Sequence, residues 1–111
     1  MSAINFLFEN GRITLSFDAQ EQKLNTLSIA VLEELERHLD RAASLEEANM
    51  LLLTSAKKEC FIAGADIKEI QDLHDESQTL SLLTKAHAIL AKLENLNMPT
   101  VAYIDGVCLG G

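Results

Sequence analysis

Long apolar runs are missing from the 111-residue sequence, and none approaches the ~20 residues needed to span a bilayer. We therefore expect no transmembrane segment. A basic leader is missing too. The first residues, Met-Ser-Ala-Ile-Asn, are neither positively charged nor rich in arginine and serine, which predicts no signal or transit peptide and a cytoplasmic location. Positive charge is scarce, with 9 basic against 17 acidic side chains and a net charge of −8. Because the few cations do not cluster, we expect no nucleic-acid partner.

Cysteine is also scarce in this sequence. Cys60 and Cys108 are the only two, and their spacing matches neither a metal-binding nor a redox motif. In a chain without a secretory signal both are expected to be reduced thiols that pack as small hydrophobes. We predict no metal site.

Apolar residues make up 48% of the sequence, which is enough for a hydrophobic core and excludes simple disorder. Their spacing predicts an opening β-hairpin followed by helices that alternate with strands. The expected strands are 4–8, 13–17, 50–54 and 100–105, and the expected helices are 28–43, 67–73 and 77–96. Strands separated by helices pair in parallel through right-handed crossovers, so the predicted fold class is α/β.

Helical periodicity divides each long predicted helix into an apolar stripe and a polar face. In helix 28–43 the stripe consists of Leu32, Leu35, Leu39 and Ala42, and the polar face of Glu33, Glu34, Glu36, Arg37 and Asp40. In helix 77–96 the stripe consists of Leu83, Ala86, Leu90 and Leu93, widened by Leu82 and Ile89. We expect both stripes to pack in the core and the polar faces to be solvated.

Two loops of small residues follow predicted strands, at the edge of the sheet where ligands of α/β proteins bind. One runs from Ala63 to Lys68 and the other from Gly106 to Gly111. Small side chains leave backbone N–H groups open to a ligand, and at the start of a helix these groups are unpaired. Two such donors that converge on one point form an oxyanion hole. The alternative is that small residues simply permit tight turns.

These loops lie in the sequences FIAGADIKEI at residues 61–70 and PTVAYIDGVCLGG at residues 99–111. Together they resemble the two signatures of the crotonase, or enoyl-CoA hydratase/isomerase, superfamily. The resemblance covers the whole chain and implies a crotonase-like ββα spiral that binds acyl-CoA thioesters. It implies that the backbone N–H groups of Ala65 and Gly111 hold the thioester oxygen. The same resemblance implies substrate contacts at Lys23, Leu24, Asp66, Ile67, Lys68 and Gly110.

The sequence QKLNTL at residues 22–27 refines this resemblance. It is more similar to the multifunctional α subunits of fatty acid oxidation complexes than to single-domain hydratases, which usually carry Arg-Pro and then a run like Ala-Leu-Asn-Ala-Leu. That resemblance implies a 3-hydroxyacyl-CoA dehydrogenase after the hydratase/isomerase domain, with NAD as its cofactor. It also implies a thiolase β subunit as a partner. No cofactor is expected within residues 1–111.

The superfamily's acid/base glutamates follow the Gly-Gly motif, at which this sequence ends. Residues 1–111 are therefore expected to be the N-terminal part of a longer hydratase/isomerase domain. Hydration requires a base to activate water and an acid to protonate the α-carbon. Because Glu69 and Glu94 match neither catalytic position, we expect the chain to stabilise an enolate without catalysing hydration by itself. The alternative is a non-catalytic acyl-CoA-binding or assembly fragment.

Two predicted site residues have alternative roles. The side chain of Asp66 is suited to the N-cap of the helix that follows it, as an alternative to attracting a cation. The ammonium of Lys68 is suited either to the phosphates of CoA or to a solvated turn.

Overall fold

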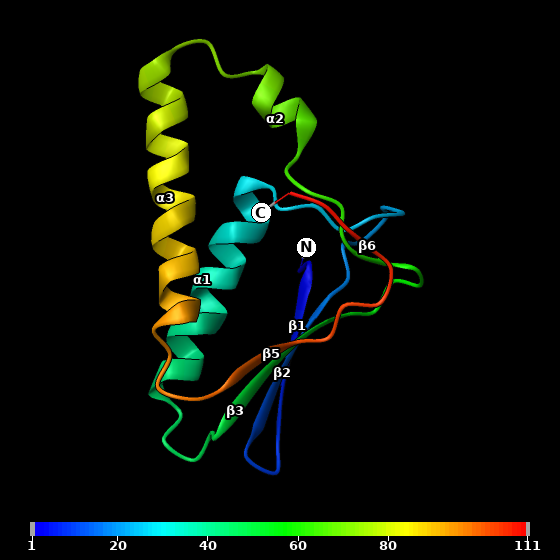
Figure 1. Ribbon diagram of the computed structural model, residues 1–111, viewed down its shortest axis with the longest axis vertical. Coiled ribbons are helices and arrows are strands. Elements are labelled where there is room, and N and C mark those ends of the chain that lie inside the picture. The colour runs from blue at the N-terminus through cyan, green and yellow to red at the C-terminus, as the bar shows by residue number, and fades with distance from the viewer. Residues whose placement is uncertain (1, 111) are drawn as a thin grey trace.

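The computed structural model describes residues 2–110, and its helices and strands alternate largely as the sequence predicts (Figure 1). The elements are β1 (Ile4–Glu9), β2 (Arg12–Phe17), α1 (Ile29–Ser44), β3 (Met50–Ser55), β4 (Cys60–Ile62), α2 (Ile67–Gln71), α3 (Glu76–Glu94), β5 (Thr100–Ala102) and β6 (Val107–Cys108). Only the short strands β4 and β6 were not predicted.

β1 and β2 form the predicted antiparallel hairpin, in which Ile4 lies opposite Phe17. Its turn consists of Asn10 and Gly11, whose φ angles of 53° and 80° fit the type I′ geometry. β3 pairs in parallel with β2, and β5 pairs in parallel with β3, so the sheet order is β1-β2-β3-β5. A hairpin followed by parallel strands confirms the predicted α/β class.

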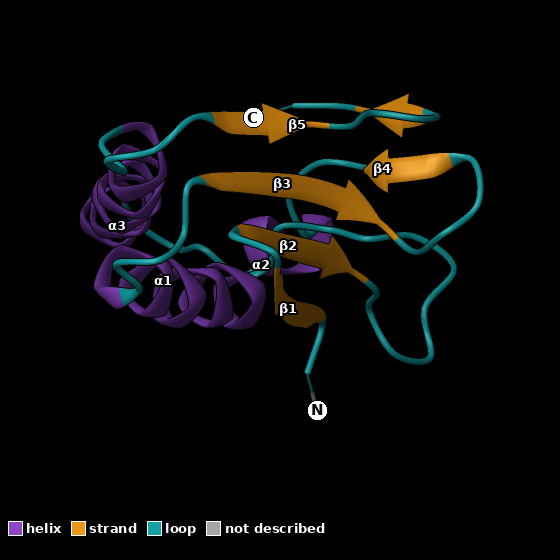
Figure 2. Cartoon of the chain, turned by 90° about the horizontal axis from the view of Figure 1, so that it is seen from below, coloured by secondary structure: helices purple, strands orange, loops and turns teal. Residues whose placement is uncertain are grey.

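The hydrophobic core lies between this sheet and α1. Both views show α1 and α3 together on the same side of the strands (Figures 1 and 2). The sheet contributes Ile13, Leu15 and Leu51 to the core, and α1 contributes its predicted stripe of Leu32, Leu35, Leu39 and Ala42. Burying one Leu or Ile side chain fully contributes ~1.5–3 kcal/mol. The stripe therefore fixes α1 firmly against the sheet.

Glu34 was predicted on the solvated face of α1 but is buried, with 8% of its surface exposed. Its carboxylate accepts hydrogen bonds from the Ser2 hydroxyl (2.6 Å), the Ala3 N–H (2.7 Å) and the Ile4 N–H (3.1 Å). Burial by itself raises the pKa of Glu34, but these bonds and one from His38 outweigh burial and lower the pKa below its ordinary value. The acid is buried because it anchors the backbone that enters β1.

α3 packs less closely on the core than its apolar stripe predicts. Of its described residues only Ile89 is buried, whereas Leu83 is 48% exposed. The helix begins after Asp75, whose carboxylate accepts a hydrogen bond from the Gln78 N–H at 2.7 Å. The predicted stripe is a core face only in part: Ala86 and Leu93 pack against the core, whereas Leu83 and Leu90 line a cavity.

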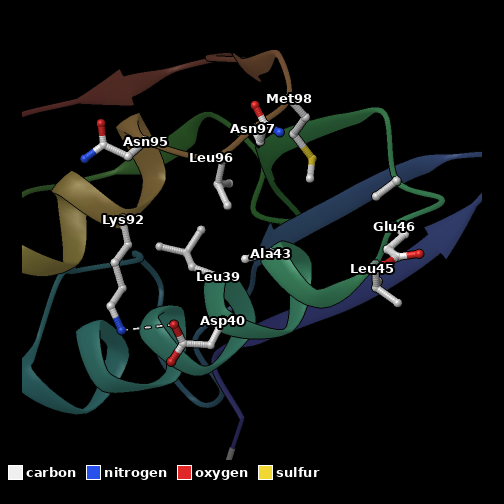
Figure 3. A pocket seen from close by; sticks show the side chains of 11 residues that line it. Leu39, Asp40, Ala43, Leu45, Glu46, Lys92, Asn95, Leu96, Asn97 and Met98 are labelled. Carbon is white, nitrogen blue, oxygen red and sulfur yellow. Dashed lines mark hydrogen bonds and ion pairs between the residues drawn. The ribbon is translucent and has the colours of Figure 1, made fainter.

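Ion pairs join α3 to α1 along their solvated sides. Lys85 Nζ lies 2.8 Å from a Glu33 oxygen, and Lys92 Nζ lies 2.9 Å from Asp40 and 3.0 Å from Glu36. The Lys92–Asp40 pair stands beside a cavity of about 500 Å³ between the C-terminal ends of the two helices (Figure 3). Water and salt screen exposed ion pairs, so these pairs add little to the stability of the fold. They orient α3 more than they stabilise the fold.

The last part of the described chain differs from the prediction. β5 ends at Ala102 and not at Asp105, although the Tyr103 N–H still donates to the Leu53 carbonyl at 2.8 Å. The predicted turn 106–111 contains β6, which pairs with β4. These strands have only two and three residues, too few for an alternating pattern to predict them.

Candidate functional site

The two small-residue loops lie side by side because β4 and β6 pair in parallel. The Val107 N–H donates to the Glu59 carbonyl and the Leu109 N–H donates to the Ile62 carbonyl, each at 3.0 Å. In Figure 1 the red end of the chain passes beside the green segment that leads into α2. Two segments more than forty residues apart in sequence therefore meet at one place.

Two glycines with positive φ lie where the two loops pass each other. Gly64 has a φ of 102°, and a Cβ at this position would lie 3.5 Å from the Leu109 carbonyl oxygen. Gly110 has a φ of 73°, and its Cβ would lie 3.5 Å from the Gly64 Cα. Both backbone conformations favour glycine. Because a Cβ at either position would make only an ordinary van der Waals contact, it is the backbone conformation and not a lack of space that selects glycine.

Asn25 holds the first loop against the hairpin. This residue is 2% exposed. Its side-chain oxygen accepts a hydrogen bond from the Ala19 N–H at 2.9 Å, and its side-chain nitrogen donates to the Ser55 hydroxyl (2.9 Å) and the Phe61 carbonyl (3.0 Å). Its own carbonyl accepts the Ala63 N–H at 2.8 Å. In the sequence Asn25 stands out only as part of the motif at residues 22–27, because no local pattern indicates such distant partners.

Ala65 follows this anchored segment. The Leu27 N–H donates to the Gly64 carbonyl at 2.8 Å, and Leu27 and Ala65 form an isolated parallel bridge. Ala65 is itself exposed. Within residues 2–110 no group accepts a hydrogen bond from its N–H. The loop of the predicted donor is thus fixed by its neighbours, and the donor N–H is unpaired among the described residues, whereas Gly111, the second predicted donor, lies outside them.

The other predicted contact residues are exposed around this loop. Lys23 and Leu24 directly precede Asn25, and 46% of the Leu24 surface is exposed. Ile67 is 70% exposed, and Lys68 and Gly110 are exposed as well. Their predicted contacts with a substrate stay predictions.

The side chain of Asp66 serves as the N-cap of α2. Its Oδ1 atom accepts hydrogen bonds from the Lys68 N–H at 3.0 Å and the Glu69 N–H at 3.3 Å. This is the alternative that the residue type favoured at the start of a helix. Asp66 therefore shapes the turn that carries Ala65.

A cavity of about 410 Å³ opens beside Ala65, between α2, α3 and the start of α1. Its lining is mainly aliphatic, and its members include Leu27, Ile29, Leu32, Ile70, Leu73, Leu82, Leu83, Ala86 and Leu90. A helical apolar stripe predicts core packing, so nothing in the sequence indicates this cavity. Leu83 and Leu90 of that stripe contribute to the apolar surface beside the loop.

Glu69 is the second acid beside this loop. Its Oε1 atom accepts a hydrogen bond from the backbone N–H of Ile29 at 2.9 Å.

Residues 2–110 contain no group of three or more His, Cys, Asp or Glu side chains placed to hold a metal ion. No helix in the same described range has the length and apolar character needed to cross a membrane.

Comparison with known proteins gives one family. A model of the family described as "Enoyl-CoA hydratase/isomerase" matches residues 11–111. The fatty acid oxidation complex subunit alpha of Idiomarina loihiensis is 34% identical over 103 residues, which cover 93% of this chain and 14% of that protein. The corresponding subunit of Aliivibrio fischeri is 36% identical over 99 residues, which cover 87% and 14%. The chain thus spans about 14% of the length of these curated relatives.

Solved structures agree with this result. An enoyl-CoA hydratase from Bacillus anthracis matches 98% of this chain and 42% of its own, with a TM-score of 0.87 and 29% identity. An enoyl-CoA hydratase from Shewanella pealeana matches 95% of this chain and 40% of its own, with a TM-score of 0.85. Its identity of 22% supports the fold alone.

Proposed function

The chain belongs to the enoyl-CoA hydratase/isomerase family and has its crotonase-like α/β fold, and we propose on that premise that the loop at Ala65 binds the thioester of an acyl-CoA. The observation that carries the proposal is the open N–H of Ala65, which lies beside both the Gly110 loop and an apolar cavity. A fixed backbone donor stabilises negative charge that develops on a carbonyl oxygen. We assign the same role to the N–H of Gly111.

The cavity is suited to the acyl chain of such a substrate. Aliphatic side chains from α1, α2 and α3 line it, and Ala65 stands at its edge. A thioester oxygen bound at Ala65 would direct the acyl chain into this space. We assign CoA contacts to the exposed segment around Lys23 and Leu24 and to Asp66, Ile67, Lys68 and Gly110.

Proton transfer is the part of the reaction that the described residues do not supply. Asp66 and Glu69 are the two acids at the loop, and each accepts backbone hydrogen bonds. Asp66 holds the first turn of α2 and Glu69 holds the N-terminus of α1, so both carboxylates are engaged in the fold. We propose that the chain alone polarises the thioester and does not hydrate crotonyl-CoA above the rate without enzyme.

The relatives named as fatty acid oxidation complex α subunits support a place in fatty acid oxidation for the protein as a whole. A 3-hydroxyacyl-CoA dehydrogenase activity with NAD, a thiolase β partner and a cytoplasmic location are further proposals from the resemblance.

The test is a binding experiment with crotonyl-CoA that carries an isotope label at its carbonyl carbon. We expect the carbonyl NMR signal to shift downfield on binding, because a hydrogen bond from Ala65 polarises the C=O group. Ala65→Pro removes the N–H and should abolish most of this shift, whereas Ala65→Gly keeps the N–H and should retain it. Circular dichroism checks that both variants fold, since proline also restricts Gly64.

Two outcomes contradict the proposal. Equal shifts in Ala65→Pro and Ala65→Gly would assign binding to other groups. A wild-type chain that does not bind crotonyl-CoA would leave the alternative of an assembly fragment.

A further inference from the structure

Glu69 joins two elements that carry the proposed site. It lies in the short helix α2, and its Oε1 atom accepts the backbone N–H of Ile29, the first residue of α1, at 2.9 Å. We propose that Glu69 is a positioning residue that locks α2, and with it the loop at Ala65, onto the N-terminus of α1. The consequence for catalysis rests on the function proposed above.

The first turn of α1 has backbone N–H groups that need an acceptor from outside the helix. The Ser28 hydroxyl accepts the Val31 N–H at 3.1 Å, so the local cap satisfies one N–H of the first turn. The N–H of Ile29 has no partner within its own helix and is satisfied by Glu69. A carboxylate is favoured at this place because it faces the positive end of a 16-residue helix.

Apolar packing holds α2 only weakly. None of the residues in Ile67–Gln71 is buried, and Ile67 and Ile70 are 70% and 51% exposed. Polar contacts must therefore fix most of its position. The Glu69 side chain supplies such a contact to an element that is itself anchored in the core.

Two hydrogen bonds connect the same pair of segments on either side of Ala65. The Leu27 N–H donates to the Gly64 carbonyl at 2.8 Å, and the Ile29 N–H donates to Glu69 at 2.9 Å. Donors two residues apart thus bind acceptors on both sides of the proposed oxyanion donor. Attachment at two points fixes the direction of the Ala65 N–H, which attachment at one point would leave free to turn.

The test measures amide hydrogen exchange in the 111-residue chain without ligand. In Glu69→Ala we expect the Leu27 amide to exchange roughly tenfold faster, the effect of losing one hydrogen bond to a charged group. Glu69→Gln retains a side-chain oxygen acceptor and should restore most of the protection. The Leu51 amide, which donates to Pro99 from the buried strand β3, should exchange equally in all three proteins.

Three results would overturn the proposal. Faster exchange at the Ile29 amide with an unchanged exchange rate at the Leu27 amide would mean that Glu69 is only a local cap. Equal acceleration in Glu69→Ala and Glu69→Gln would assign the effect to charge and not to the hydrogen bond. Acceleration at Leu51 to the same extent would mean that the whole fold is weakened.

Binding of crotonyl-CoA separates this proposal from the proposed function. If both hold, Glu69→Ala weakens binding or reduces the carbonyl shift, and Glu69→Gln restores it. A wild-type chain that does not bind would refute the function, while the exchange data would still decide whether Glu69 positions the loop. Normal binding and a normal shift in Glu69→Ala would refute the positioning role.

Discussion

Asn25 is the residue whose loss should disturb the fold around the candidate site most directly. Its side chain is buried and joins the hairpin end, β3 and the segment of β4 that leads to Ala65. Asn25→Ala removes all of these contacts and leaves the Ala19 N–H and the Phe61 carbonyl without the partner that Asn25 supplies, whereas the Phe17 carbonyl keeps the Ala56 N–H at 3.0 Å.

The size of the loss follows from the number of groups left unsatisfied. Each buried polar group without a partner costs about 1–3 kcal/mol, and water entering the space recovers part of that. For two backbone groups we expect Asn25→Ala to lower the free energy of unfolding by about 2–4 kcal/mol. Such a loss is a large share of the ~5–15 kcal/mol typical of a domain.

Urea unfolding followed by circular dichroism measures this change. Asn25→Asp is the matched control, because it keeps the shape and the acceptor for Ala19 but turns a second oxygen toward the Phe17 and Phe61 carbonyls. It should be at least as destabilising as Asn25→Ala at neutral pH. Ser55→Ala removes one partner only and should cost about 0.5–1.5 kcal/mol. A loss below about 1 kcal/mol in Asn25→Ala would refute the reasoning.

Three further predictions concern other parts of the fold. Because the folded-state pKa of Glu34 is lowered from 4.5, its contribution to stability is complete above that value and is lost as the pH falls through the folded-state pKa. Acid titration of unfolding should therefore show a smaller decline in Glu34→Gln than in the wild type. Gly106→Ala should cost about 2–5 kcal/mol by thermal or urea unfolding, because φ is 107° and a Cβ would overlap the Glu59 carbonyl. Gly11→Ala, which meets only a movable side chain, should cost less. In a thiol-reagent assay without reduction, exposed Cys108 should react in the native chain and buried Cys60 only after unfolding. A Cys60–Cys108 disulfide would contradict the expected reduced state.

The hairpin and the first long helix were predictable because local rules determine them. Asn10 and Gly11 adopt the positive φ angles that their residue types favour in a tight turn. Leu35 and Leu39 lie on the one apolar face of α1, so periodicity predicts that this face of the helix turns toward the sheet. The family was predictable from the two loop motifs, and the comparisons confirm the family.

Long-range polar contacts could not be predicted in the same way. Periodicity assigned Glu34 to solvent, yet the backbone of Ala3 and Ile4 lies against it and satisfies its charge. Some apolar residues of the α3 stripe pack against the core and others line a cavity, and the pattern does not tell which. Only the packed structure separates buried Ile89 from exposed Leu83.

The proposed site combines these two kinds of information. Its ligand-binding groups are backbone donors, and small residues such as Gly64 and Ala65 in the sequence indicate where a backbone is accessible. Its supports are side chains that reach far along the chain: Asn25 binds Phe61, 36 residues away, and Glu69 binds Ile29, 40 residues away. A backbone donor cannot be altered by changing its own side chain, short of proline. Substitutions at Asn25 and Glu69 are therefore the most informative route to the geometry of the Ala65 N–H, because they move the donor while leaving it present.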